Sequence, residues 1–216
     1  MQIKKSDHTS HNHNKNQQNR LFATTLVMLQ TPGMGLTQAG LIREKNALSM
    51  LAQTFLGMTI GALLWIICGF GLTFGRSLGD LGLIGDPFEY VFFTNVSIKK
   101  PYHQETAPNI PAVLFASFQM MFALMTPLIV SGSWVERMSF KSVVIFLIVW
   151  PILKNPKNIV SIFDCVTMNR RGWLCKLGFE DFAGGIVIHA SAGVSGLVVS
   201  VLLHKRFGRE QLGIFF

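Results

Sequence analysis

The sequence is poor in charged residues. Asp, Glu, Lys and Arg make up 14% of its 216 residues, whereas hydrophobic residues make up 50%. A soluble domain carries about 25% charged residues, so this composition excludes an ordinary soluble protein and favours a membrane protein. The 19 Lys and Arg residues exceed the 11 Asp and Glu residues, but they lie between apolar runs. We therefore expect no nucleic-acid partner.

The sequence also lacks the cysteine patterns of metal modules and disulfide frameworks. The three cysteines are Cys68, Cys165 and Cys175. They have no C-x-x-C spacing and no accompanying histidine pattern, which excludes a zinc module. Several histidines lie in residues 1–20, but a polar segment without Cys or carboxylate ligands predicts no metal site. We expect neither a metal nor a cofactor.

Residues 1–20 contain no apolar face that a fold could bury. Their composition, rich in Asn, His, Gln and Lys, predicts a disordered polar tail. A membrane domain is predicted over 21–209, with an atypical stretch at 151–171, and 210–216 form a truncated C-terminus. The tail is long for the basic region of a signal peptide, so the first apolar run is interpreted as a retained span.

Long runs without any charged residue divide the chain. They are 21–42, 47–75, 111–135, 142–153 and 182–203. A helix needs about 20 such residues to cross a bilayer, and amphipathic helices of soluble proteins do not leave such runs uncharged. The pattern predicts an all-α polytopic membrane protein with about five transmembrane helices. The fourth run is short and meets Pro151, so it spans only if flanking residues extend it.

Three segments carry recognisable motifs. Residues 31–53 read TPGMGLTQAGLIREKNALSMLAQ, residues 115–150 begin FASFQMMF, and residues 181–189 read DFAGGIVIH. Together they resemble the ammonium transporter family, over about 22–150 and 172–209. The resemblance implies the first half of a fold that is built from two inverted halves. One departure is Thr37-Gln38, where the family commonly has Phe-Tyr.

His189 is the most informative single position. An imidazole within a charge-free span is costly to desolvate unless it faces a partner or a wet cavity. Hydrogen bonding to a neighbouring helix for packing alone is the alternative explanation. The resemblance implies that His189 is one of two pore histidines that face each other and relay substrate or a proton.

Asp181 precedes the last span, where a carboxylate can cap free amide groups and complement the helix dipole. The resemblance adds an electrostatic pull on a cation near the recruitment site to this structural role. Both interpretations predict damage when Asp181 is removed.

Phe118 and Phe122 lie on one face of the third span because they are four residues apart. Such a pair ordinarily packs against lipid or other helices. The resemblance implies instead that Phe122 lines the external ammonium site and that Phe118 contributes to a gate of stacked phenyl rings. Aromatic faces attract ammonium by about 0.5–2 kcal/mol, which is enough to select a cation and still release it.

The chain departs from the family between Trp150 and Gly172. Residues 154–168, KNPKNIVSIFDCVTM, replace a stretch in which the family carries a tryptophan of the external site, and Asn169 stands at the expected position. One wall of the recruitment site is therefore predicted to be missing. The sequence also stops at Phe216, before the second half that the resemblance implies, so we expect a fragment.

Two functions remain open. The first is transmembrane transport of ammonium or ammonia, in the lipid bilayer of the plasma membrane, by a homo-oligomer that the family implies to be a trimer. The second is a non-conducting truncated paralogue that at most associates with full-length subunits. An enzyme is not expected, because the spans hold no paired base and nucleophile. Residues 1–216 alone are expected not to conduct, since one half cannot line a pore that lies between two halves.

Overall fold

The computed structural model describes residues 3–78, 85–102, 108–154, 178, 181 and 184–203. Its helices are α1 (Ile3–Gly40), α2 (Glu44–Leu64), α3 (Phe70–Phe74), α4 (Ala112–Val130), α5 (Phe140–Lys154) and α8 (Ser191–Leu202). Short turns of other helix types join them, namely the π-helices η1 (Trp65–Gly69) and η4 (Gly185–Ala190) and the 3-10 helices η2 (Val91–Phe93) and η3 (Ser131–Ser133). The described residues contain no β-strand, only two isolated bridges. The predicted all-α fold is confirmed.

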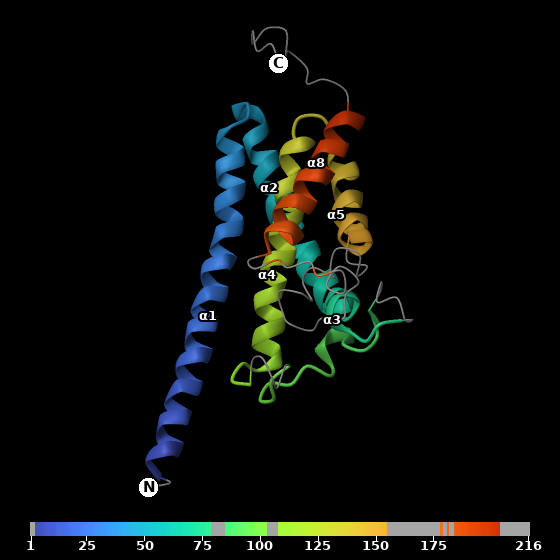
Figure 1. Cartoon of the computed structure of the whole chain (residues 1–216). Coiled ribbons are helices and arrows are strands. Elements are labelled where there is room, and N and C mark those ends of the chain that lie inside the picture. The colour runs from blue at the N-terminus through green and yellow to red at the C-terminus, as the bar shows by residue number, and fades with distance from the viewer. Residues whose placement is uncertain are drawn as a thin grey trace.

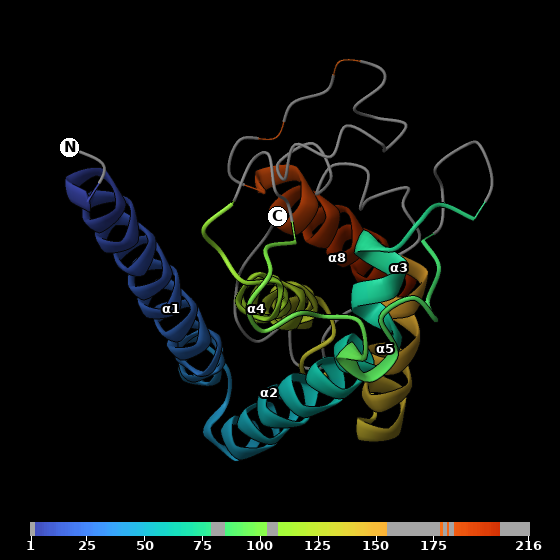
Figure 2. The same ribbon diagram turned by 90° about the horizontal axis from the view of Figure 1, so that it is seen from below.

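The helices form a bundle in which the chain direction alternates. Figure 1 shows α1, α2, α4, α5 and α8 running roughly along one axis, and Figure 2 shows them gathered around α4 when viewed from below. Three continuous helical stretches are long and apolar enough to cross a membrane: Glu44–Phe74, Ala112–Ser133 and Gly185–Leu202. These correspond to the predicted runs 47–75, 111–135 and 182–203.

The other two predicted runs form helices that do not meet the same criteria. The run 142–153 lies within α5, whose apolar part, Phe140–Ile152, is short, as its length and Pro151 indicate. The run 21–42 covers the C-terminal half of α1, up to Gly40, and the turn after it; several Thr and Gln residues and Pro32 lower its apolar content. The count of about five spans therefore divides into three long apolar helices, one short apolar helix and one mixed helix.

Helix α1 includes most of residues 1–20, for which the sequence predicts a disordered polar tail. Helix α1 begins at Ile3 and continues without interruption to Gly40. A helix that is already nucleated extends at little cost, and the Lys, Gln and Arg residues of this segment have favourable helix propensities. The N-terminal part of α1 projects away from the other helices in both views (Figures 1 and 2). The structure describes the atypical stretch 151–171 only as far as Lys154. The C-terminus 210–216 lies outside the described residues.

Helices α1 and α2 approach each other closely at Gly35. A Cβ atom on Gly35 would lie 2.6 Å from both Cγ2 and Oγ1 of Thr54, and Thr54 is buried and donates its hydroxyl to the Met50 carbonyl. The absence of a side chain at Gly35 therefore permits this helix crossing, in the manner of small residues in other membrane bundles.

We expect Gly35→Ala to destabilise the protein by about 1–3 kcal/mol, because the added methyl group overpacks the α1–α2 contact. Gly33→Ala is the matched control, since a Cβ there meets nothing within 4 Å. Thermal denaturation of both variants in detergent measures the difference. Equal melting temperatures for the two variants would contradict the close contact.

A polar network holds α1 against the end of α4. The amide of Gln38 donates to the Leu128 carbonyl at 3.0 Å, and the Ser131 hydroxyl donates to Gln38 Oε1 at 2.6 Å. Ser131 is buried. Gln38 is one of the two residues at which the chain departs from the residues common in the family. Its side-chain amide links α1 to the end of α4 through the Leu128 carbonyl and the Ser131 hydroxyl.

Among the described residues, α4 and α5 hold α8 on one side. Ala192 is buried, and the Trp150 indole N–H donates to the Ser195 hydroxyl at 3.1 Å. Only 17% of the apolar stretch Gly185–Leu202 is buried. The opposite side of α8 exposes several large apolar residues, namely Val194, Leu197, Val198, Val201 and Leu202.

Candidate functional site

The start of the last apolar stretch has an unusual backbone. Gly184 has a φ of 77°, which a residue without a side chain adopts at no steric cost, and η4 follows it as a π-helix. Such wide turns are rare and occur frequently at functional sites. His189 is the fifth of the six residues of η4, and its side chain is exposed. The imidazole is therefore on the surface of the described residues and not packed into a neighbouring helix.

Asp181 binds the beginning of η4. Its carboxylate accepts hydrogen bonds from the backbone N–H groups of Gly185 at 2.9 Å, Ile186 at 2.9 Å and Val187 at 3.2 Å. Asp181 is only 8% exposed. These are the free amide groups at a helix start that a capping carboxylate satisfies. The contacts therefore have the geometry of a helix cap. The same carboxylate fixes the π-helical turn that carries His189.

The rings of Phe118 and Phe122 are in contact, with centroids 4.9 Å apart and planes inclined at 77°. This edge-to-face geometry is favourable for aromatic pairs. It shows that the four-residue spacing places both side chains on one side of α4. Phe118 also contacts a cation of the chain, because the Arg20 guanidinium carbon lies 4.4 Å from the centre of its ring.

Phe122 connects this aromatic pair to the π-helix. It packs against a small apolar cluster whose buried members are Met125, Val187 and Ile188. Val187 and Ile188 directly precede His189 in η4. The structure therefore brings Phe118, Phe122 and η4 into one continuous arrangement, and Asp181 holds the start of η4. His189 is adjacent to this arrangement through the backbone.

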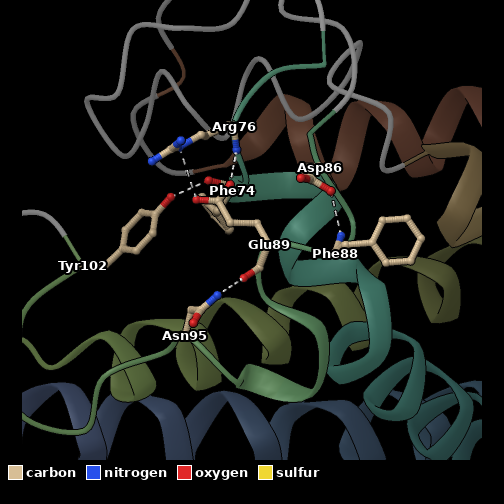
Figure 3. A network of polar contacts seen from close by, with 7 residues as sticks. All are labelled: Phe74, Arg76, Asp86, Phe88, Glu89, Asn95 and Tyr102. Atoms are coloured by element: carbon tan, nitrogen blue, oxygen red, sulfur yellow. Dashed lines mark hydrogen bonds and ion pairs between the residues drawn. The ribbon is translucent and has the colours of Figure 1, made fainter.

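The loop after α3 closes the end of the bundle with polar contacts, which Figure 3 shows from close by. Tyr102 donates its hydroxyl to the Phe74 carbonyl at the end of α3, and the Asn95 amide donates to the Glu89 carbonyl at 2.7 Å. Glu89 also accepts the backbone N–H of Arg76. Burial and the neighbouring Glu89 carboxylate raise the pKa of Tyr90 to about 12, so this phenol stays protonated at neutral pH.

An aromatic cluster lies beneath this loop. Phe70 is completely buried, and its ring contacts those of Trp65, Phe74, Tyr90, Phe93 and Tyr102. The residue pattern does not reveal this cluster, because its members come from η1, α3 and the loop, which have no common spacing. The cluster anchors the loop beside the N-terminal end of α4. The described chain resumes at Pro108, four residues before that helix begins.

Glu136 joins the α1–α2 turn to the α4–α5 turn. Its carboxylate accepts hydrogen bonds from Arg43 Nε at 3.0 Å and from the Asn46 amide at 2.7 Å. Glu136 has a φ of 62°, a left-handed conformation that is strained for a residue with a side chain. The Arg43 hydrogen bond, followed by that of Asn46, lowers the pKa of Glu136 to about 2 despite an opposing effect of burial.

This clamp predicts an acid-sensitive stability. A carboxyl group whose pKa is lowered by folding stabilises the protein above its unfolded pKa, and that contribution is lost as the pH falls towards the folded pKa. For Glu136 the window runs from about 4.5 down to about 2. Because Arg43 is half exposed and screened by solvent, we expect a loss of about 1–2 kcal/mol.

Thermal melts of wild-type protein and Glu136→Gln between pH 7 and pH 3 measure this contribution. The variant is expected to be less stable at pH 7 and to lose less stability on acidification. Glu44→Gln, which neutralises an exposed acid at the start of α2, is the control. Parallel pH profiles for wild type and Glu136→Gln would contradict the clamp.

The chain is similar to known ammonium transporters. The family model described as Ammonium Transporter Family matches residues 20–213. "Ammonium transporter 1" of Dictyostelium discoideum is 39% identical over 194 residues, which are 89% of this chain and 40% of that protein. "Ammonium transporter Amt1" of Archaeoglobus fulgidus is 34% identical, over 90% of this chain and 44% of that protein.

Solved structures show the same architecture. The crystal structure of Saccharomyces cerevisiae Mep2 superposes with a TM-score of 0.70 and 32% identity, over 84% of this chain and 40% of that one. A structure titled "Sensor Amt Protein" has a TM-score of 0.70 and 25% identity, over 92% of this chain and 46% of that one. The chain thus spans about two fifths of the length of the relatives it matches.

Proposed function

Because this chain belongs to the ammonium transporter family, we propose that it forms one part of a transmembrane pathway for ammonium or ammonia. The observation that carries the proposal is that Phe122, whose ring contacts that of Phe118, packs against an apolar cluster that includes Val187 and Ile188 of the π-helix that holds His189. Its three long apolar helices make the chain an integral membrane protein, and we place it in the plasma membrane as a homo-oligomer, a trimer by analogy with the family.

Each residue has a distinct role in this proposal. The ring faces of Phe118 and Phe122 attract an ammonium cation, and their apolar surroundings disfavour larger hydrated ions. His189, at the end of this arrangement, receives or passes on substrate or a proton, since a neutral imidazole can both donate and accept hydrogen bonds. Asp181 acts through the backbone by holding η4 in place. Transport of this kind moves the substrate across the membrane without converting it into another compound, so we propose no enzymatic reaction.

The experiment uses a chimera, because the chain matches only part of each relative. Residues 20–213 replace the 194 matching residues of the Dictyostelium discoideum protein, and the chimera is expressed in cells that lack ammonium uptake. We expect growth on limiting ammonium and uptake of radiolabelled methylammonium. A chimera that reaches the membrane in normal amounts but restores neither growth nor uptake would contradict the proposal.

The exposed side of α8 favours a second candidate function. It carries a stripe of apolar residues that no described residue covers, and His189 in the preceding η4 is exposed as well. A chain that does not conduct but associates through this side with complete transporter subunits would account for the same surface. Co-purification of tagged residues 1–216 with the intact relative, without any uptake by the chimera, would favour this alternative.

A further inference from the structure

Arg20 places a fixed positive charge on the aromatic pair. Its guanidinium carbon lies 4.4 Å from the centroid of the Phe118 ring, so the cation covers one face of that ring. Arg20 lies on α1 and Phe118 on α4, about two turns from the start of that helix. The contact therefore joins two separate helices, at the position directly before the first charge-free run.

The ring is the principal partner of this charge. Arg20 is half-buried, and in the described part of the chain it takes part in neither of the two ion pairs, which are Arg43–Glu136 and Arg76–Glu89. A guanidinium that is partly removed from water and lacks a carboxylate gains most from the negative face of an aromatic ring. The geometry holds the charge on Phe118 rather than leaving it in solvent.

An ammonium cation would seek the same face of the ring. The quadrupole of a phenyl ring is negative on its faces and positive at its edge. The ring of Phe118 also makes an edge-to-face contact with the ring of Phe122. A guanidinium and an ammonium ion cannot occupy one face together, and their like charges repel each other at short range. Binding of a cation at Phe118 must therefore displace Arg20 or tolerate its charge.

We propose that Arg20 competes, as an internal cation, with ammonium-type cations for the face of Phe118 and so weakens their binding. The inference rests on the proposed function, because it assigns the ligand of that site. Arg20 thereby sets the affinity of the site, because a cation that binds at Phe118 must first displace the Arg20 guanidinium.

The test measures cation binding directly on the chain of residues 1–216 in lipid nanodiscs. 4-Fluorophenylalanine at position 118 reports the ring environment by ¹⁹F NMR while methylammonium chloride is added, with sodium chloride at equal ionic strength as the blank. Arg20→Gln is expected to lower the midpoint of the titration by on the order of 5-fold, a ratio within the range of one cation–π contact. Arg20→Lys keeps the charge and is expected to keep the midpoint within about 2-fold.

Lys15→Gln is the matched control, because it removes one exposed positive charge from the same helix. A fall in the midpoint for Arg20→Gln alone supports the proposal. An equal fall for Lys15→Gln would show a general electrostatic effect, and an unchanged midpoint for Arg20→Gln, or no response of the ring to methylammonium in any variant, would overturn the proposal. Uptake by the chimera is a separate readout, so a response of Phe118 without uptake would count against the proposed function alone.

Discussion

His189→Ala in the chimera is expected to lower methylammonium uptake by roughly 10-fold or more while leaving the amount of protein in the membrane unchanged. The first effect follows from the loss of the only group in η4 that can donate and accept a proton, and positioned proton transfer is commonly worth at least this factor. The second follows from its exposure, since truncation of an exposed side chain costs little stability. His189 is exposed in the described chain.

Val194→Ala is the control for this substitution, because Val194 is 64% exposed and lies on the same helical stretch five residues later. It is expected to leave uptake close to the wild-type value. Uptake and membrane amounts are measured in parallel by radiolabel and by immunoblot. If His189→Ala transported as well as Val194→Ala, the histidine would have no part in the mechanism.

Asp181→Ala is expected to cause the largest loss of stability, on the order of 3 kcal/mol. The substitution leaves three backbone N–H groups without their acceptor at the start of η4, and hydrogen bonds to a charged group are stronger than neutral ones. Asp181 is buried, so water replaces the carboxylate poorly. Detergent-solubilised wild type and variant are compared by thermal denaturation and by unfolding in increasing denaturant.

Asp181→Asn separates the cap from the charge. Asparagine retains one acceptor oxygen and is a good helix cap, so its stability is expected to lie between those of wild type and Asp181→Ala. If Asp181 also attracts a cation, Asp181→Asn in the chimera raises the methylammonium concentration needed for half-maximal uptake. A stability of Asp181→Ala within 0.5 kcal/mol of the wild-type value, a shift typical of exposed sites, would contradict the capping role.

The sequence predicts the local features of this site well. Charge-free runs predict the apolar helices because the bilayer imposes their length. The position of Asp181 predicts a cap, and the structure shows the three hydrogen bonds of such a cap. The spacing of Phe118 and Phe122 predicts a shared face, and their rings are in contact. Each of these features depends on residues that are close together in the chain.

Contacts between distant parts of the chain could not be predicted in the same way. The Gln38 network joins residues about ninety positions apart, as does the Glu136 clamp with Asn46. Neither periodicity nor composition specifies which turns meet. Two positions only hinted at these contacts. Gln38 is an amide where the family commonly has an aromatic residue, and Arg20 stands directly before the first charge-free run. The π-helical form of η4 has no comparable signal in the residue pattern.

Ammonium flux through the purified chimera in liposomes tests the central claim most directly. The chimera is reconstituted with a pH-sensitive dye inside the vesicles, and an ammonium gradient is applied by rapid mixing. We expect flux well above that of empty vesicles for the chimera. We expect a strongly reduced flux when both Phe122→Ala and His189→Ala are introduced, since Phe122 packs against the residues of η4 that directly precede His189. Folded chimera that gives the flux of empty vesicles, or a double variant that conducts as well as the unaltered chimera, would contradict the central claim.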